Sequence, residues 1–236
     1  MGVRNVAEGL HIIPGLVNIY LLEIADGLAV IDTGFPGSAG KILDAVRAIG
    51  RVPADVRHIL LTHAHPDHIG STAALKQKTG AKVWAHAVDA PIIEAGKGFR
   101  HTDACPGLRN RILASVLRRF MKDLEPVTVD HLLSDGDIIP FAPALTVIHV
   151  PGHCAGQIAF HLKRSGGILI TADTCVHRRG RIRLPVAAED LDEAHRSLVK
   201  LAGFDFDRLC FMHGSPILAG ADTKFRAWAS GGALER

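Results

Sequence analysis

Residues 60–70 read LLTHAHPDHIG and place four potential metal ligands within a few positions: His63, His65, Asp67 and His68. The apolar run before them indicates a buried strand, and the small residues after them indicate the start of a helix. Short turns that join a strand to a helix often carry the chemistry of an enzyme. We therefore interpret this turn as the centre of a metal site, in preference to a polar loop that is merely rich in histidine.

The spacing within the turn predicts two neighbouring metal positions. In an extended chain, residues two apart point to the same side, so His63 and His65 can bind one ion together. Pro66 then helps to turn the chain, which directs Asp67 and His68 towards a second position beside the first.

Further ligand-type residues follow other apolar, strand-like runs. His153 follows the run 145–150, Asp173 ends GILITAD, His213 follows LCFM, and Asp32 ends LAVID. This pattern is typical of a site assembled at one edge of a buried sheet. Imidazole nitrogens and carboxylate oxygens suit zinc and neighbouring first-row metals.

Together these residues resemble the metallo-β-lactamase superfamily of hydrolases, over almost the whole chain from Leu10 to about Ile217. The resemblance implies that three histidines bind one metal: His63, His65 and His153. It implies that three other residues bind a second metal: Asp67, His68 and His213. Asp173 would bridge the two ions, and Asp32 would be a buried aspartate that holds the ligand loop and does not touch the metals.

The resemblance also implies the fold. We expect an α+β structure, an αββα sandwich in which two mixed β-sheets face each other and helices cover the outer faces. Residues 1–236 would form one domain, with a helical cap inserted at about 88–128. The implied cofactors are two divalent ions, with zinc expected first and manganese, iron or cobalt also compatible with these ligands.

The implied reaction is hydrolysis of an ester, thioester or lactone by a hydroxide that bridges the two metals. Asp67 would be the catalytic residue that orients the nucleophile or moves its proton. Other readings stay open: an oxygenase similar to persulfide dioxygenases with one iron, and a binding protein without catalysis. A β-lactamase is disfavoured, because those enzymes typically carry Cys or Ser where this chain has Asp173.

Two branches of the superfamily are similar in particular residues. The pair Asp173-Thr174 resembles glyoxalase II thioesterases, although their glutathione-binding pattern is not evident. Quorum-quenching lactonases usually carry a tyrosine three residues after the bridging aspartate, where this chain has Val176. The chain contains a single tyrosine, Tyr20.

A basic amphipathic segment lies outside the ligand pattern. Apolar residues recur every four positions from Leu108 to Leu124, with arginines between them, so we expect one helix that Pro126 ends. It could be a surface helix, a lid over the site, or the contact of a homodimer. Binding to an anionic membrane surface is a further alternative.

A second basic run follows the proposed bridging aspartate: Arg178, Arg179, Arg181 and Arg183. Arginine binds carboxylate and phosphate groups in bidentate geometry. We expect that one or more of the first three arginines, with His177 nearby, selects a small anionic substrate. An ordinary exposed loop is the alternative.

Composition limits the remaining functions. The 236 residues are 47% hydrophobic and carry a net charge of +3, which suits one enzyme domain and gives no general case for nucleic-acid binding. No apolar run is long enough for stable insertion into a membrane. The first residues lack the apolar core of a signal peptide, and the four scattered cysteines form no CxxC pair, so we expect a cytoplasmic protein.

Overall fold

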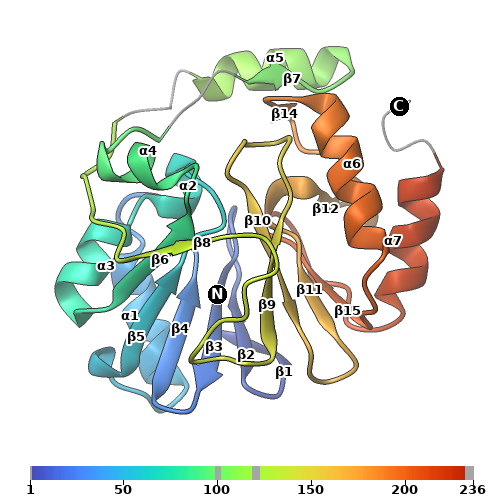
Figure 1. Ribbon diagram of the computed structural model, residues 1–236. Helices are drawn as coiled ribbons and strands as arrows, with labels where there is room; N and C mark the ends of the chain where they lie inside the picture. The colour runs from blue at the N-terminus through green and yellow to red at the C-terminus, as the bar shows by residue number, and fades with distance from the viewer. Residues whose placement is uncertain (1, 99–101, 119–122, 232–236) are drawn as a thin grey trace.

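Two β-sheets face each other in the computed structural model, which describes residues 2–98, 102–118 and 123–231 (Figure 1). Seven strands form the first sheet, in the order β1 (Arg4–Ala7), β2 (Leu10–Ile13), β3 (Ile19–Ile24), β4 (Gly27–Ile31), β5 (Val56–Leu60), β6 (Lys82–His86) and β8 (His131–Leu133). Four strands form the second, in the order β15 (Arg208–Cys210), β11 (Ile168–Ile170), β10 (Ile158–Leu162) and β9 (Leu145–His149).

Helices cover the outer faces of both sheets. On the first sheet lie α1 (Ala39–Ala48), α3 (Thr72–Thr79) and the short α4 (Ala90–Glu94); on the second lie α6 (Leu191–Ala202) and α7 (Ala221–Ser230) (Figure 1). The helices form because each presents one apolar face: α1 buries Ile42, Leu43 and Val46, and α6 buries Leu198 and Leu201. The expected αββα sandwich is confirmed.

Successive side chains of these strands point to opposite faces of the sheet, and each face packs into a different buried cluster. Tyr20 and Leu22 point between the sheets, where they pack with Phe160 and Ile170 of the second sheet in one buried cluster. Leu21 and its neighbours on the other face pack under α1 and α3 in a second cluster. A third cluster lies between the second sheet and its helices. The central strands are therefore buried on both faces, whereas the edge strands β1 and β8 are partly exposed.

The strand directions bring several strand ends to one edge of the sandwich. β4 and β5 are parallel neighbours, and so are β11 and β15. β9 runs in the same direction as these last two, because β10 is antiparallel to both β9 and β11. The segments that follow β4, β5, β9, β11 and β15 therefore meet at one place, as the sequence pattern predicted.

The smaller elements lie around this edge. The turn after β5 contains α2 (Pro66–Ile69), and a hairpin follows Asp173: β12 (Val176–Arg178) paired with β13 (Arg181–Arg183). β7 (Asp103–Ala104) pairs with β14 (Ala187–Ala188) and leads into α5 (Leu108–Arg118), which lies across the end of the sandwich at the top of Figure 1. No helix in the described part of the chain is long and apolar enough to cross a bilayer.

The predicted helix from Leu108 to Leu124 is too long. α5 is described as far as Arg118, residues 119–122 lie outside the described residues, and Asp123 and Leu124 are not helical. Leu124 instead donates its backbone N–H to Gly96, and it packs against the cluster under the first sheet. In the sequence, Leu124 fits the four-residue spacing of the apolar stripe. In the structure, it does not belong to that stripe, because its side chain packs against the first sheet.

The apolar stripe of α5 is mostly open to solvent. Leu108 is 71% exposed, Ile112 59% and Val116 45%, whereas Ala114 is buried. A homodimer contact through this stripe stays a prediction.

Tyr20 joins the two sheets next to the end of β15. Its hydroxyl donates a 2.7 Å hydrogen bond to the carbonyl oxygen of Phe211, two residues before His213, and its side chain is fully buried. We expect Tyr20→Phe to lower the free energy of unfolding by about 0.5–1.5 kcal/mol, the usual value of one buried hydrogen bond. Urea denaturation measures this change; an unaltered midpoint would show that the bond contributes nothing, since Asn18 also donates to the same carbonyl.

Candidate metal centre

The ligand turn is shaped by its own backbone. His65 is extended and precedes α2, and its carbonyl accepts hydrogen bonds from the backbone N–H groups of His68 and Ile69. Pro66 occupies the first helical position, where its missing N–H costs nothing. Gly70 must be glycine, because a Cβ there would lie 2.4 Å from Pro36 Cδ.

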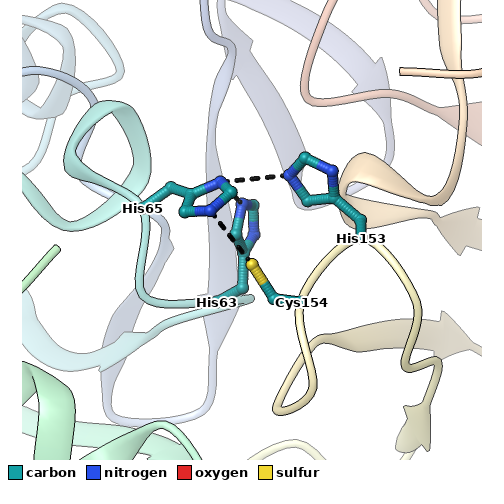
Figure 2. A group of neighbouring side chains, drawn as sticks. All are labelled: His63, His65, His153 and Cys154. Carbon is teal, nitrogen blue, oxygen red and sulfur yellow. Dashed lines mark hydrogen bonds between the residues drawn. The ribbon is translucent and has the colours of Figure 1, made fainter. Parts of the chain in front are cut away.

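Three imidazole nitrogens converge from two sides of the sandwich (Figure 2). His65 Nδ1 lies 3.1 Å from His63 Nε2 and 3.0 Å from His153 Nε2. All three side chains are buried. They therefore form the first of the two groups that the resemblance implied.

The hydrogen bonds on the far side of these rings determine which nitrogens carry hydrogen. His153 Nδ1 donates to the carbonyl oxygen of Ala187 at 2.7 Å, which leaves its Nε2 as an acceptor. His63 Nδ1 lies 3.0 Å from the Thr62 hydroxyl, which itself donates to Asp32, so His63 Nε2 is also an acceptor. One hydrogen on His65 Nδ1 cannot serve both acceptors, whereas a cation between the rings would satisfy all three nitrogens.

A second group lies beside the first and is built around one carboxylate oxygen. Asp173 Oδ2 is 3.1 Å from His213 Nε2, 3.6 Å from His68 Nε2 and 3.7 Å from His153 Nε2. Asp67 Oδ2 lies 3.6 Å from both His68 Nε2 and His213 Nε2. Asp173 thus contacts ligands of both groups, which is the position required of a bridging residue.

Buried polar atoms without partners show that this donor set fits a metal. Neither His68 Nε2 nor Asp173 Oδ1 has a hydrogen-bond partner among the described residues, although both are buried. An unsatisfied buried polar atom is costly, and a metal ion that accepts its lone pair removes the cost. Neighbouring groups of three or four ligand atoms, all within 4.8 Å of one another, make the cluster suited to divalent metal binding.

The electrostatics of the two groups differ. Burial lowers the pKa of His63, His65 and His153, so these rings stay neutral and available as ligands. Burial also disfavours a charged His68, but the carboxylates of Asp67 and Asp173 outweigh it and hold the pKa of His68 well above its usual value. The second group therefore attracts positive charge.

Asp32 holds the ligand turn through both of its carboxylate oxygens. Oδ1 accepts from the backbone N–H of Thr62 at 2.8 Å, and Oδ2 accepts from the Thr62 hydroxyl and from His68 Nδ1, each at 2.7 Å. Its backbone adopts a φ of 57°, which is strained for a residue with a side chain. Asp32 belongs to none of the groups of candidate ligand atoms.

Both groups open into one cavity of about 230 Å³. Its walls are mainly apolar, and they include Ala114 from α5 and Thr102 just before β7. Arg178 lines this cavity, but the other residues expected to bind substrate do not: Arg179 occupies the hairpin tip, and Arg181 and His177 line a neighbouring cavity. His177 Nδ1 donates to the carbonyl oxygen of Ser215.

Several supporting contacts were not predicted from the sequence, which indicated that Cys154 lies near the ligands but favoured a packed small residue. Asp89 accepts a 2.8 Å hydrogen bond from the backbone N–H of Ala64, and Cys154 Sγ lies 3.2 Å from His65 Nε2. His213 Nδ1 donates to the carbonyl oxygen of Leu16. The position of Cys154 next to His153 was a usable signal, whereas backbone carbonyls leave no trace in a sequence.

Comparison with known proteins identifies the family. A family profile described as the metallo-beta-lactamase superfamily matches residues 12–213. This chain belongs to that superfamily. The match includes every residue of the two groups above, and it supports an enzyme of the hydrolase class.

Curated relatives in the superfamily are similar at modest identity. The probable metallo-hydrolase YflN of Bacillus subtilis is 25% identical, over 89% of this chain and 86% of its own length. An N-acyl homoserine lactonase from Bacillus sp. is 22% identical, over 77% and 73%. A hydroxyacylglutathione hydrolase of Aeromonas salmonicida is 31% identical over 82% of this chain, but only 59% of the longer relative is covered.

Solved structures agree on the fold. The subclass B3 metallo-β-lactamase BJP-1 of Bradyrhizobium japonicum superposes with a TM-score of 0.73 at 22% identity, over 98% of this chain and 90% of that protein. This likeness shows the αββα architecture of the superfamily.

Removal of the Asp32 carboxylate tests whether the ligand turn depends on it. We expect Asp32→Asn to weaken zinc binding by roughly 10–100-fold, because His68 and Thr62 lose the charged acceptor that orients them. Competition with a chromogenic chelator measures the affinity, and Asp44→Asn, which changes an exposed carboxylate on α1, is the control. Equal zinc affinity in both variants would show that Asp32 does not position the ligands.

Proposed function

We propose that this protein is a metal-dependent hydrolase that cleaves an ester, thioester or lactone bond. The observation that carries the proposal is the position of Asp173, whose Oδ2 lies within 3.1–3.7 Å of histidines from both ligand groups. Such an arrangement suits two ions that share one carboxylate. A single isolated group would not require a residue in this position.

The proposed ligands are those implied by the resemblance: His63, His65 and His153 for one ion, Asp67, His68 and His213 for the other, with Asp173 between them. Zinc is the expected metal, because imidazole and carboxylate donors dominate the set. When bound, such ions polarise a carbonyl group and lower the pKa of water towards neutrality. The chain supplies the rest of the chemistry.

Asp67 is the proposed catalytic residue of the chain. Its side chain is 20% exposed and lines the cavity, so one carboxylate can contact a water molecule that enters beside the substrate. There it would orient the attacking water and accept its proton. Asp173 is only 6% exposed and is less available for this role.

The cavity walls favour a substrate with an apolar acyl part. Leu16, Phe35, Val176 and Pro185 surround the ligand groups, and Ala114 closes the cavity from α5. The cap would thereby exclude water from the reacting bond, which supports its interpretation as a lid.

Two named relatives suggest the bond classes to test, a lactone and an acylglutathione thioester. A lactonase reaction would have to proceed without the tyrosine common in that branch. Val176 stands at that position, and Tyr20 is fully buried between the sheets and bonded to Phe211.

The proposal is tested by comparing the turnover of an acyl-homoserine lactone with that of S-lactoylglutathione. In both assays, the rate of acid release measures hydrolysis. We expect zinc- or manganese-loaded protein to cleave at least one of them, and His65→Ala to abolish that turnover. Asp67→Ala should lower kcat by roughly 10²–10⁴-fold with the circular dichroism spectrum unchanged, because proton transfer loses its base. Asp44→Ala is the matched control on the surface.

Other results would reject parts of this proposal. Normal turnover by Asp67→Ala would remove its catalytic role. Oxygen consumption by protein that contains one iron, with no hydrolysis of any acyl bond, would reject the hydrolase in favour of the oxygenase alternative.

Arg178 is the proposed selector of anionic substrates, because it lines the cavity that holds the ligand groups. We expect Arg178→Ala to raise KM for the anionic S-lactoylglutathione by about tenfold, through loss of a charge-assisted contact, and to leave KM for a neutral lactone nearly unchanged. Arg179→Ala removes the same charge from the hairpin tip and should have a smaller effect. Equal changes in KM for both substrates would contradict selection by charge.

A further inference from the structure

A second cavity of about 610 Å³ adjoins the first. It lies between the β12–β13 hairpin, α7 and the start of α5. Val176, Arg178 and Val186 line both cavities, so the two are neighbours that share a wall. We call this second cavity the basic groove.

Four cationic residues line the basic groove, Arg178, Arg181, Arg183 and Lys224, and no aspartate or glutamate among the described residues does. None of the four forms an ion pair with any residue that the structure describes. Some arginines elsewhere on the surface are paired, such as Arg47 with Asp44 and Arg196 with Glu193, so the distinctive feature of the groove is that four unpaired cations line one hollow. Unpaired cations gathered around one hollow repel each other, and an anionic ligand would relieve that repulsion.

Apolar side chains also line the groove, together with two planar rings, His177 and Trp228. Trp228 of α7 lines it together with Ile182, Leu184 and Ile217, and all four pack against the cluster under α6 and α7. Trp228 is half-buried and lies next to Phe225, with 5.8 Å between the ring centroids. Stacking on an indole is a common way to bind a planar ring such as a nucleobase.

We propose that the basic groove binds a nucleoside diphosphate, the carrier portion of an acyl thioester whose acyl group enters the metal cavity. The base would stack on Trp228, and the diphosphate would contact Arg181, Arg183 and Lys224. Arg178 lines both cavities, so the carrier would pass it between the groove and the metal cavity. Glutathione supplies carboxylates but no planar ring, so it would leave Trp228 unused.

The size and the reaction are compatible with this ligand. A volume of about 610 Å³ falls within the usual range of small-molecule sites. The reaction, which rests on the proposed function, is hydrolysis: the C–S bond breaks, water supplies the new C–O bond, and the thiolate leaves with a proton from that water. No oxidant or further reactant is needed.

Binding of ADP to the full-length protein tests the groove separately from catalysis. Isothermal titration is carried out on the metal-loaded protein, and His65→Ala is titrated beside it so that phosphate binding at the metal centre is recognised. We expect ADP to bind, and Arg181→Ala and Lys224→Ala each to weaken it by roughly five- to tenfold, as one charge-assisted contact is lost. Lys163→Ala, which removes an exposed lysine outside the groove, is the matched control.

A comparison of ADP with inorganic pyrophosphate isolates the contribution of the Trp228 ring to binding. Trp228→Leu should weaken ADP by about tenfold and leave the affinity of inorganic pyrophosphate nearly unchanged, because only ADP carries a base. Absence of ADP binding, or equal losses in Lys163→Ala and Arg181→Ala, would overturn the inference. Retained ADP binding in protein that hydrolyses no acyl bond would instead support the groove and reject the proposed function.

Discussion

The hydrogen bonds of Asp32 are the constraint on which the candidate metal centre depends. One carboxylate at the end of β4 holds the backbone and hydroxyl of Thr62, which follows β5, and the far nitrogen of His68. A fully buried carboxylate is costly unless it accepts such hydrogen bonds. Thr62 and His68 in turn keep their orientation because they donate to it. The strained backbone at Asp32 is compatible with this view, since strain persists where surrounding contacts outweigh its cost.

The folded chain holds its ligand atoms in an arrangement that is unfavourable without a cation. His65 Nδ1 lies about 3 Å from two acceptor nitrogens and can donate to only one of them, and buried atoms of His68 and Asp173 lack partners among the described residues. Packing of the two sheets on either side keeps the strand ends in place, because Phe160, Ile170 and Tyr20 share one core. A metal that binds the folded chain would therefore also stabilise the fold, by an amount that grows with its affinity.

The ligand residues could be predicted because they lie in the segments that follow apolar strands, and the ends of these strands meet at one edge of the sandwich. The supporting atoms could not, because the carbonyls of Ala187 and Leu16 accept from His153 and His213 only through tertiary contact. The predicted end of the cap helix, Leu124, was wrong for a related reason. Periodicity in the sequence cannot show whether the side chain of Leu124 packs with the helix or against the first sheet. Charge alone also could not separate Arg178 from Arg179, since the turn of the hairpin decides which side chain lines the cavity.

Arg178 lines both cavities, so it lies where a substrate selected in the basic groove would enter the metal cavity. The metal cavity is small and mostly apolar, so it offers little that distinguishes one acyl group from another. The basic groove is larger and charged, and it is remote from the reacting bond. Binding energy from such a remote part raises the rate only if it positions the bond more closely for attack. Because Arg178 lies in the shared wall, a carrier held in the groove would fix the direction from which its acyl group reaches Asp67.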